Sequence, residues 1–185
     1  MGRPSKRAER RRDLARAFIR VLGTHGQGGA TVAAVAAEAG IAPGLVHHYF
    51  ASKADLYEAV LDELLAGFRR RIDAEPSADP LEAYAAAALA LGERSDVAAA
   101  RAWVGFLATA VGEPALFAKM RRVLDAEVAH VERRGGSSLS TADASAVVAF
   151  VVGALVFGAF APRKTAGFAA TSLRRMIAGL RRGAA

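Results

Sequence analysis

The chain has 185 residues, of which 53% are hydrophobic, so it can bury a sizeable core and is not expected to be disordered. Its formal net charge of +7 at neutral pH favours an anionic partner, either nucleic acid or a lipid surface. It contains no cysteine, which excludes disulfides, thiolate zinc sites and cysteine nucleophiles and fits a cytoplasmic location.

The first elements predicted are a basic arm and an amphipathic helix. The cations of the arm are Arg3, Lys6, Arg7, Arg10, Arg11 and Arg12. The arm continues into a helix in which Leu14, Phe18 and Leu22 recur at helical spacing. This helix should end in the glycine-rich loop over residues 23–29.

Two short helices and one longer helix follow. Thr31 stands where the cap of the first short helix should be, and Gly40 breaks that helix. Pro43 fits the first turn of the second short helix, which should run to about Tyr49. Ser52 can cap the longer helix. The apolar stripe of that helix recurs every four residues, at Leu56, Val60, Leu64 and Phe68.

The rest of the chain also predicts helices, which makes the expected fold all-α with about nine helices. The proline-bracketed segment over residues 76–80 is the predicted internal boundary. Five helices are expected beyond it, at about residues 81–91, 97–111, 114–134, 141–160 and 165–182. Alanine is abundant, β-branched runs are scarce, and no alternating strand pattern is present.

Residues 31–50 meet the requirements of a helix-turn-helix, in which two short helices are joined by a turn containing glycine. Gly40 can adopt a positive φ without strain. Val46 and Phe50 lie one turn apart on the second helix, and both can bury against the first helix. That rotation leaves four residues facing outward, namely Pro43, Gly44, His47 and His48.

The string TVAAVAAEAGIAPGLVHHYFASKADLYEAVL resembles the DNA-binding region of TetR-family regulators. The shared features are a threonine-initiated helix, an Ala-Gly turn, a His-Tyr-Phe run and a Ser-Lys-x-x-Leu start to the next helix. The resemblance implies double-stranded DNA as partner, with phosphates held by Thr31, Tyr49 and Lys53. The groove would then be faced by Pro43, Gly44, His47 and His48. Gln27 departs from the pattern, because the family usually has an aromatic residue after the loop glycine.

Physical arguments support part of this assignment. Lys53 would place an ammonium at a helix N-terminus, where phosphate is attracted. The basic arm could be solvated, but basic arms beside helix-turn-helix domains enter the minor groove, so a DNA role is favoured. His47 and His48 point about 100° apart on a helix and make a poor metal pair. No metal site and no cofactor are therefore expected.

Residues 144–161 contain no charge and can form either a membrane span or a buried helix. Burial is favoured because charged residues flank the run directly, no aromatic belt is present, and alanine and glycine are frequent. The resemblance places the last two helices in a four-helix dimer interface, where Gly153 and Gly158 would permit close crossing. A homodimer without a membrane segment is therefore expected, and its operator should be palindromic.

The resemblance also divides the chain by role. Residues 1–52 would form the arm and a three-helix DNA-binding domain, residues 53–75 a connecting helix, and residues 76–185 a ligand-binding and dimerisation domain. The aromatic candidates for an effector pocket are Tyr84, Trp103, Phe106 and Phe117. At helical spacing such residues are more often ordinary core. The stretch RAWVGFLATAVGEPALFAKMRRV is similar to the choline-sensing BetI branch, which would make Trp103 a cation–π wall for a quaternary ammonium.

These observations predict a ligand-responsive repressor, in which a small-molecule effector shifts the helix that carries Lys53 and changes the spacing of two recognition helices. Two alternatives remain open: a constitutive architectural DNA binder without a sensor, and a membrane-anchored regulator. An enzyme is not expected, because the sequence has no GxSxG motif, phosphate loop, metal-ligand pair or acid pair placed for catalysis.

Overall fold

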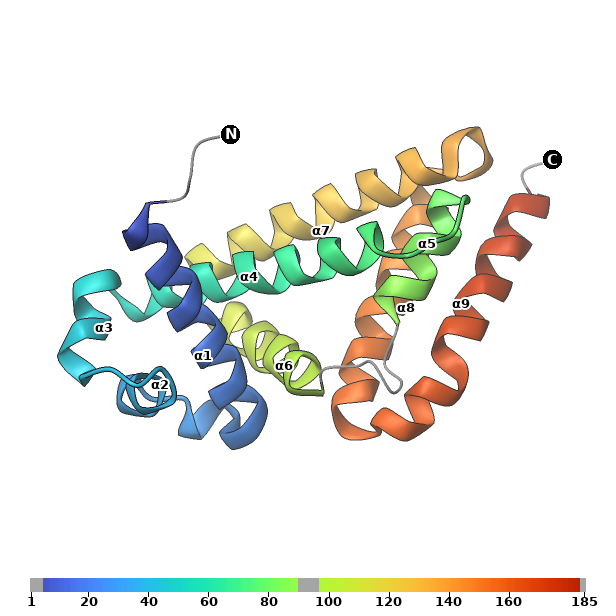
Figure 1. The fold of residues 1–185 in the computed structure, drawn as a ribbon. Helices are drawn as coiled ribbons and strands as arrows, with labels where there is room; N and C mark the ends of the chain where they lie inside the picture. The colour runs from blue at the N-terminus through green and yellow to red at the C-terminus, as the bar shows by residue number, and fades with distance from the viewer. Residues whose placement is uncertain (1–4, 90–96, 184–185) are drawn as a thin grey trace. The chain divides into compact units, whose positions relative to one another are not determined.

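The computed structural model describes residues 5–89 and 97–183, so Arg3 of the predicted arm lies outside the described residues. Every long element in the described part of the chain is an α-helix, which confirms the predicted fold class (Figure 1). The helices are α1 (Lys6–Gly29), α2 (Val32–Glu38), α3 (Pro43–Tyr49), α4 (Lys53–Asp73), α5 (Pro80–Ala88), α6 (Val97–Gly112), α7 (Pro114–Gly135), α8 (Thr141–Phe160) and α9 (Pro162–Gly183). A short 3₁₀ turn, Gly136–Ser138, joins α7 to α8.

The chain packs as two compact units. The first comprises Met1–Gly67 and Ala98–Leu116, and it contains α1 to α3, most of α4 and most of α6. The second comprises Phe68–Val97 and Phe117–Ala185, and it contains the end of α4, α5, most of α7, α8 and α9. Helix α4 therefore contributes residues to both units.

Three aromatic rings lie at the centre of the first unit. Phe18 of α1 meets Tyr57 of α4 edge to face, with ring centroids 5.1 Å apart, and Tyr57 lies 6.3 Å from Phe106 of α6. All three side chains are at most 1% exposed. The apolar stripes predicted for α1 and α4 thus share one core.

The end of α1 differs from the predicted loop. The helix continues past Gly23 and is interrupted only at Gly26, where φ is +65° and the chain leaves helical geometry. Arg101 of α6 donates a hydrogen bond to the Gly23 carbonyl oxygen (3.2 Å), and the Thr24 hydroxyl donates to the Arg20 carbonyl oxygen (2.9 Å). A single glycine costs a helix only about 1 kcal/mol, so Gly23 does not end it.

The start of α1 also differs from the prediction of an arm. The helix begins at Lys6, so the cations from Lys6 to Arg12 project from a helix. The sequence pattern assigns these cations to a basic arm that continues into the helix. The acidic and basic residues of this segment favour a helix, and its first turn includes Glu9, which interacts favourably with the helix dipole.

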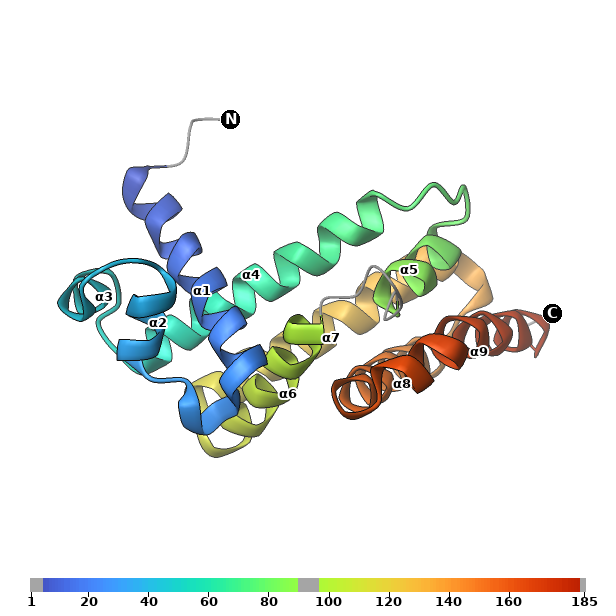
Figure 2. The same ribbon diagram turned by 60° about the horizontal axis from the view of Figure 1, so that its bottom comes forward.

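In the second unit, α8 and α9 lie side by side (Figures 1 and 2). The buried residues of α9 recur every four positions, at Thr165, Ala169, Leu173 and Ile177. Helix α8 begins with a capping box in which Ser140 and Asp143 satisfy each other's backbone N–H groups. Helix α9 begins at Pro162, three residues before the predicted start at 165, and the first turn of a helix is a position where the missing N–H of proline costs no hydrogen bond.

Asp79 joins α5 to α9. Its carboxylate caps α5 by accepting hydrogen bonds from the Leu81 and Glu82 N–H groups, at 2.8 and 3.2 Å. The same carboxylate accepts two hydrogen bonds from the Arg181 guanidinium, at 2.6 and 3.1 Å. The hydrogen bonds from Arg181 lower the pKa of Asp79 from 3.8 to about 2.

Replacing Asp79 with alanine should lower the free energy of unfolding by about 1–2 kcal/mol at neutral pH, mainly through loss of the helix cap. Because the folded-state pKa is depressed, the ionised carboxylate stabilises the fold fully above its ordinary pKa of 3.8, and this contribution is lost as the pH falls towards 2. Urea unfolding of the wild-type protein and the Asp79→Ala variant, measured from pH 3.8 down to about 2, should show the difference in their free energies of unfolding becoming smaller. The same substitution at the exposed Asp125 of α7 should have little effect at any pH.

Helix α8 is long and apolar enough to cross a bilayer by length and composition, with a mean hydropathy of 2.1 over its most apolar window. Only 39% of that window is buried. The side chains of Phe157 and Phe160 are 49% and 80% exposed, and Phe168 of the adjacent α9 is 41% exposed. The pair α8 and α9 therefore presents an apolar face that the described part of the chain does not cover.

Candidate nucleic-acid interface

Helices α2 and α3 form a tight bihelical unit around a glycine turn. Thr31 caps α2, and its hydroxyl oxygen accepts a hydrogen bond from the Ala34 N–H at 3.1 Å. Gly40 has a φ of +66°, as the prediction of a left-handed turn requires. The Ile41 N–H then donates to the Ala36 carbonyl oxygen at 3.0 Å, which closes the turn.

The orientation of α3 follows from two anchors. Val46 is 2% exposed and Phe50, which follows the helix, is 3% exposed. Pro43, Gly44, His47 and His48 are all exposed, as predicted from the helical spacing. Leu45, which the sequence analysis did not single out, is 47% exposed and adds an apolar side chain to this outer surface. Tyr49 is half-buried, and its ring packs edge to face with His48 at 5.2 Å.

Arg11 of α1 holds the turn between α3 and α4. Its guanidinium donates two hydrogen bonds to the Asp55 carboxylate, at 3.1 and 2.6 Å, and another to the Tyr49 carbonyl oxygen. It also lies 4.3 Å from the centroid of the Phe50 ring. Asp55 accepts a further hydrogen bond from the Ala51 N–H at 3.2 Å. We call these contacts of Arg11, Tyr49, Phe50 and Asp55 the Arg11 clamp.

The charge pairing in the Arg11 clamp changes the pKa of Asp55. The hydrogen bonds from Arg11 lower the pKa of Asp55 below its ordinary value of 3.8. One helical turn earlier, Arg7 donates to the His48 carbonyl oxygen at 3.2 Å and lies 5.8 Å from the Tyr49 ring centroid. Two cations assigned to a DNA-binding arm thus contact the end of α3. No pattern in the sequence singles out Arg7 and Arg11 among the basic residues of this segment, because their partners lie about 40 positions away in the chain.

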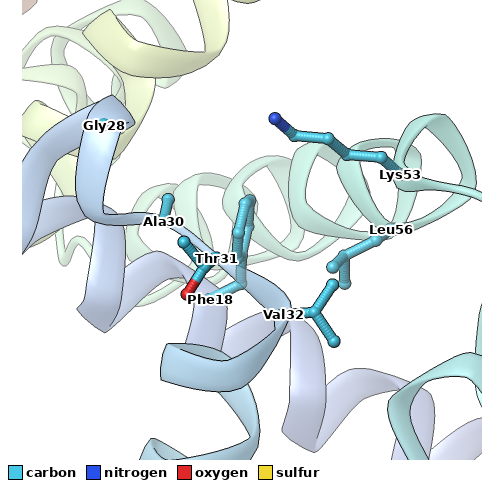
Figure 3. A pocket seen from close by; sticks show the side chains of 7 residues that line it. All are labelled: Phe18, Gly28, Ala30, Thr31, Val32, Lys53 and Leu56. Carbon is cyan, nitrogen blue, oxygen red and sulfur yellow. The ribbon is translucent and has the colours of Figure 1, made fainter. Parts of the chain in front are cut away.

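Thr31 and Lys53 lie together in the first unit, although 22 positions separate them in the sequence. Both are exposed, and both line the pocket shown in Figure 3. The Lys53 ammonium lies 5.6 Å from the centroid of the Tyr57 ring. Two of the three residues expected to hold phosphate are therefore neighbours in space.

The four residues predicted to form an effector pocket have different surroundings. Phe106 is fully buried against Tyr57 in the first unit, and Trp103 is half-buried in the same helix. Tyr84 is fully buried in the second unit, where its ring meets Phe68 edge to face at 5.7 Å. Phe117 is 52% exposed. The described contacts of Phe106 and Tyr84 are those of core residues.

Tyr84 carries one further feature. Neither its hydroxyl nor Glu127 Oε1 makes a well-aligned hydrogen bond within the described part of the chain, although both atoms are buried. Burial raises the pKa of Tyr84 well above its ordinary range, and the nearby Glu127 carboxylate raises it further. A buried polar pair therefore lies inside the second unit, in a region where the sequence predicted aromatic groups alone.

Comparison with known proteins agrees with this architecture. The family model described as "Bacterial regulatory proteins, tetR family" matches residues 14–60, which span most of α1, all of α2 and α3, and the start of α4. Residues 14–60 therefore form a DNA-binding domain of the TetR type. This confirms the resemblance inferred from the sequence, and it places this domain among regulators, as expected, and not among enzymes.

The chain is also similar to individual regulators. The HTH-type transcriptional regulator BetI of Brucella canis is 45% identical over 65 residues, which cover 35% of this chain and 33% of the relative. The match thus spans about a third of the length of that relative. It supports the family firmly and the BetI branch only loosely.

Solved structures extend the likeness over nearly the whole fold. A transcriptional regulator from Rhodococcus sp. Rha1 superposes with a TM-score of 0.82 at 24% identity, covering 94% of this chain and 96% of that chain. The multidrug binding protein EbrR complexed with malachite green gives a TM-score of 0.66 at 28% identity, covering 91% and 98%. The nearly complete coverage indicates that the second unit also has the fold of solved TetR-like regulators.

Proposed function

We propose that this protein is a cytoplasmic transcriptional regulator that binds duplex DNA by inserting α3 into the major groove. The observation that carries this proposal is the division of α3 into two sides. Val46 anchors it inward, while Pro43, Gly44, Leu45, His47 and His48 form one exposed surface. Small residues at the start of the helix allow close approach to the groove floor, and His47 is placed to reach base edges or phosphate.

Phosphate contacts would come from the residues around this surface. Thr31 and Lys53 flank α3 in the sequence and are both exposed, and Tyr49 is the last residue of α3. A net charge of +7 attracts DNA over longer distances. The Arg11 clamp would hold α3 in the orientation that lets all these groups act together.

The apolar face of α8 and α9 supports a homodimer. Phe157 and Phe168 pack edge to face with centroids 6.0 Å apart, and they remain exposed beside Phe160. A second copy would cover these rings. Gly153 is also exposed, and a Cβ there would meet no atom within 4 Å, so the backbone of α8 is open to close approach by a partner helix. A two-fold dimer would present two α3 helices to a palindromic operator.

Sedimentation of the full chain in detergent-free buffer tests the dimer. A dimeric mass that falls to a monomeric mass in the Phe160→Glu variant supports it. A chain that stays in solution only with detergent would favour the membrane-anchored alternative, because α8 also satisfies the length and hydropathy of a span.

We further propose that a small-molecule effector releases the protein from its operator, which makes it a repressor. Helix α4 supports this coupling, because it starts at Lys53 beside the DNA-binding helices and ends within the second unit. A shift of α4 would change the spacing of two α3 helices in a dimer. The fold shared with a multidrug binding protein that was solved with malachite green supports a small-molecule ligand.

Selection of bound sequences from random duplexes directly tests sequence-specific DNA recognition. A palindromic consensus is expected, and His47→Ala should relax base preference at one position of each half-site at a cost of about 1–3 kcal/mol. A weak preference without symmetry would instead support an architectural binder.

Replacing Lys53 with methionine should weaken binding to all duplexes alike and reduce the salt dependence of the affinity by about one counterion. The measurement is fluorescence anisotropy over a range of salt concentrations. Lys164→Met, at an exposed position in α9, is the matched control and should leave the slope unchanged. An equal change in both variants would contradict a phosphate contact at Lys53.

A further inference from the structure

The first unit contains a pocket of about 230 Å³ between α1, the start of α2 and the start of α4 (Figure 3). Its apolar lining comes from Phe18, Ala30, Val32 and Leu56, and its polar lining from Thr31 and Lys53. In the view of Figure 3, Phe18, Thr31, Val32 and Leu56 gather below the extended Lys53 side chain. The pocket lies entirely within the first unit, so it is separate from any ligand site in the second.

The apolar lining suits one small ring. Phe18 and Leu56 line the pocket but are only 1% and 2% exposed, so a bound ring would also contact the half-buried Val32. A dry apolar cavity of roughly 150 Å³ holds a benzene molecule. A pocket of about 230 Å³ therefore has room for a benzene ring with one small substituent.

The polar residues that line the pocket indicate which charge the substituent on the ring should carry. Lys53 supplies an ammonium, and no acidic side chain is among the described residues that line the pocket. The Thr31 hydroxyl oxygen accepts a hydrogen bond from the Ala34 N–H and points away from the Lys53 ammonium in Figure 3. The charged donor of the pocket is therefore Lys53, and it favours an anionic acceptor such as a carboxylate.

We propose that this pocket binds a small aromatic carboxylate, with its ring against Phe18 and Leu56 and its carboxylate held by Lys53. The consequence rests on the proposed function, because Lys53 is also an expected phosphate contact. A carboxylate bound to Lys53 occupies the donor that a DNA phosphate needs. The ligand therefore competes with DNA at the first unit directly, without a conformational signal from the second.

Calorimetric titration of the full chain with benzoate, in the absence of DNA, tests the site. Benzamide, which lacks the charge, and acetate, which lacks the ring, are compared at the same ionic strength. We expect benzoate to bind about tenfold more tightly than either, and Lys53→Met to weaken it by about tenfold through loss of one charged hydrogen bond. Val32→Phe, which fills the pocket without altering Lys53 or Thr31, should abolish benzoate binding.

Displacement of a fluorescent duplex tests the competition. Benzoate should release DNA from the wild-type protein and fail to do so from Val32→Phe. Benzoate binding unaffected by both variants, or acetate as effective as benzoate, would overturn the pocket. If the chain binds no duplex, the proposed function fails, while the calorimetry still decides the pocket. If it binds duplex but not benzoate, the pocket fails alone.

Discussion

Arg11→Gln should weaken operator binding by roughly tenfold, although the proposed groove-facing side chains are unchanged, because the loss of a charged hydrogen-bond partner costs about 1–3 kcal/mol. A helix of seven residues such as α3 has little stability of its own. Its position depends on Val46, on Phe50 and on the Arg11 clamp, which holds the Tyr49 carbonyl oxygen and Asp55 together. Without the guanidinium, the turn after α3 loses its connection to α1.

A substitution of Asp55, the partner of Arg11, distinguishes this positioning role from a purely electrostatic effect on DNA binding. Asp55→Asn removes a negative charge close to DNA, so electrostatics alone would tighten binding. The Arg11 clamp predicts the opposite, because the carboxylate orients Arg11 and accepts from the Ala51 N–H. Anisotropy with the selected operator measures both variants. Tighter binding by Asp55→Asn would contradict the positioning role.

Arg12→Gln is the matched control for the charge change in α1. Arg12 is exposed on the same helix, one residue from Arg11, and its substitution removes the same charge. It should alter the salt dependence of DNA binding at most slightly. A loss equal to that of Arg11→Gln would mean that both residues act through their charge alone.

Phe106→Ala should lower the free energy of unfolding by about 3–5 kcal/mol, as expected for a fully buried phenylalanine. Phe106 is 0% exposed and lies against Tyr57, which in turn packs on Phe18. Its removal leaves a cavity beneath the helices that carry the DNA-binding surface. Urea unfolding followed by circular dichroism measures the change.

Phe117→Ala is the matched control, since the residue type and the substitution are the same but Phe117 is 52% exposed. Its effect on unfolding should be below about 1 kcal/mol. The comparison also separates a core role from an effector role. An effector-site residue at position 106 would tolerate alanine with little loss of stability and a changed response to ligand.

Helical periodicity predicted the helices and the inward and outward sides of α3. Val46 and Phe50 are one turn apart, and this spacing alone fixes which face of a short helix is buried. The Gly40 turn was also predictable, since few residues other than glycine adopt its φ readily. The local sequence was therefore enough to predict features that depend on neighbouring residues alone, such as the buried face of a helix and a glycine turn.

Contacts between distant segments were not predictable in this way. Arg11 and Asp55 are 44 positions apart, and nothing local distinguishes Arg11 from its basic neighbours. The end of α1 was missed for a similar reason, because Arg101 contacts the Gly23 carbonyl oxygen from 78 positions away. The aromatic residues of α5 to α7 have helical spacing whether they line a pocket or a core, so periodicity could not separate the two roles.

The two-sided construction of α3 has an evolutionary consequence. The residues that keep the helix in place are buried or lie in neighbouring segments, whereas Gly44, Leu45, His47 and His48 project outward. Substitutions at these four sites leave the interior packing unchanged, so their thermodynamic cost to the fold is small. Paralogues could therefore diverge in the promoters they recognise by altering only these positions, and new target preferences could be grafted onto the same scaffold by combinatorial mutagenesis.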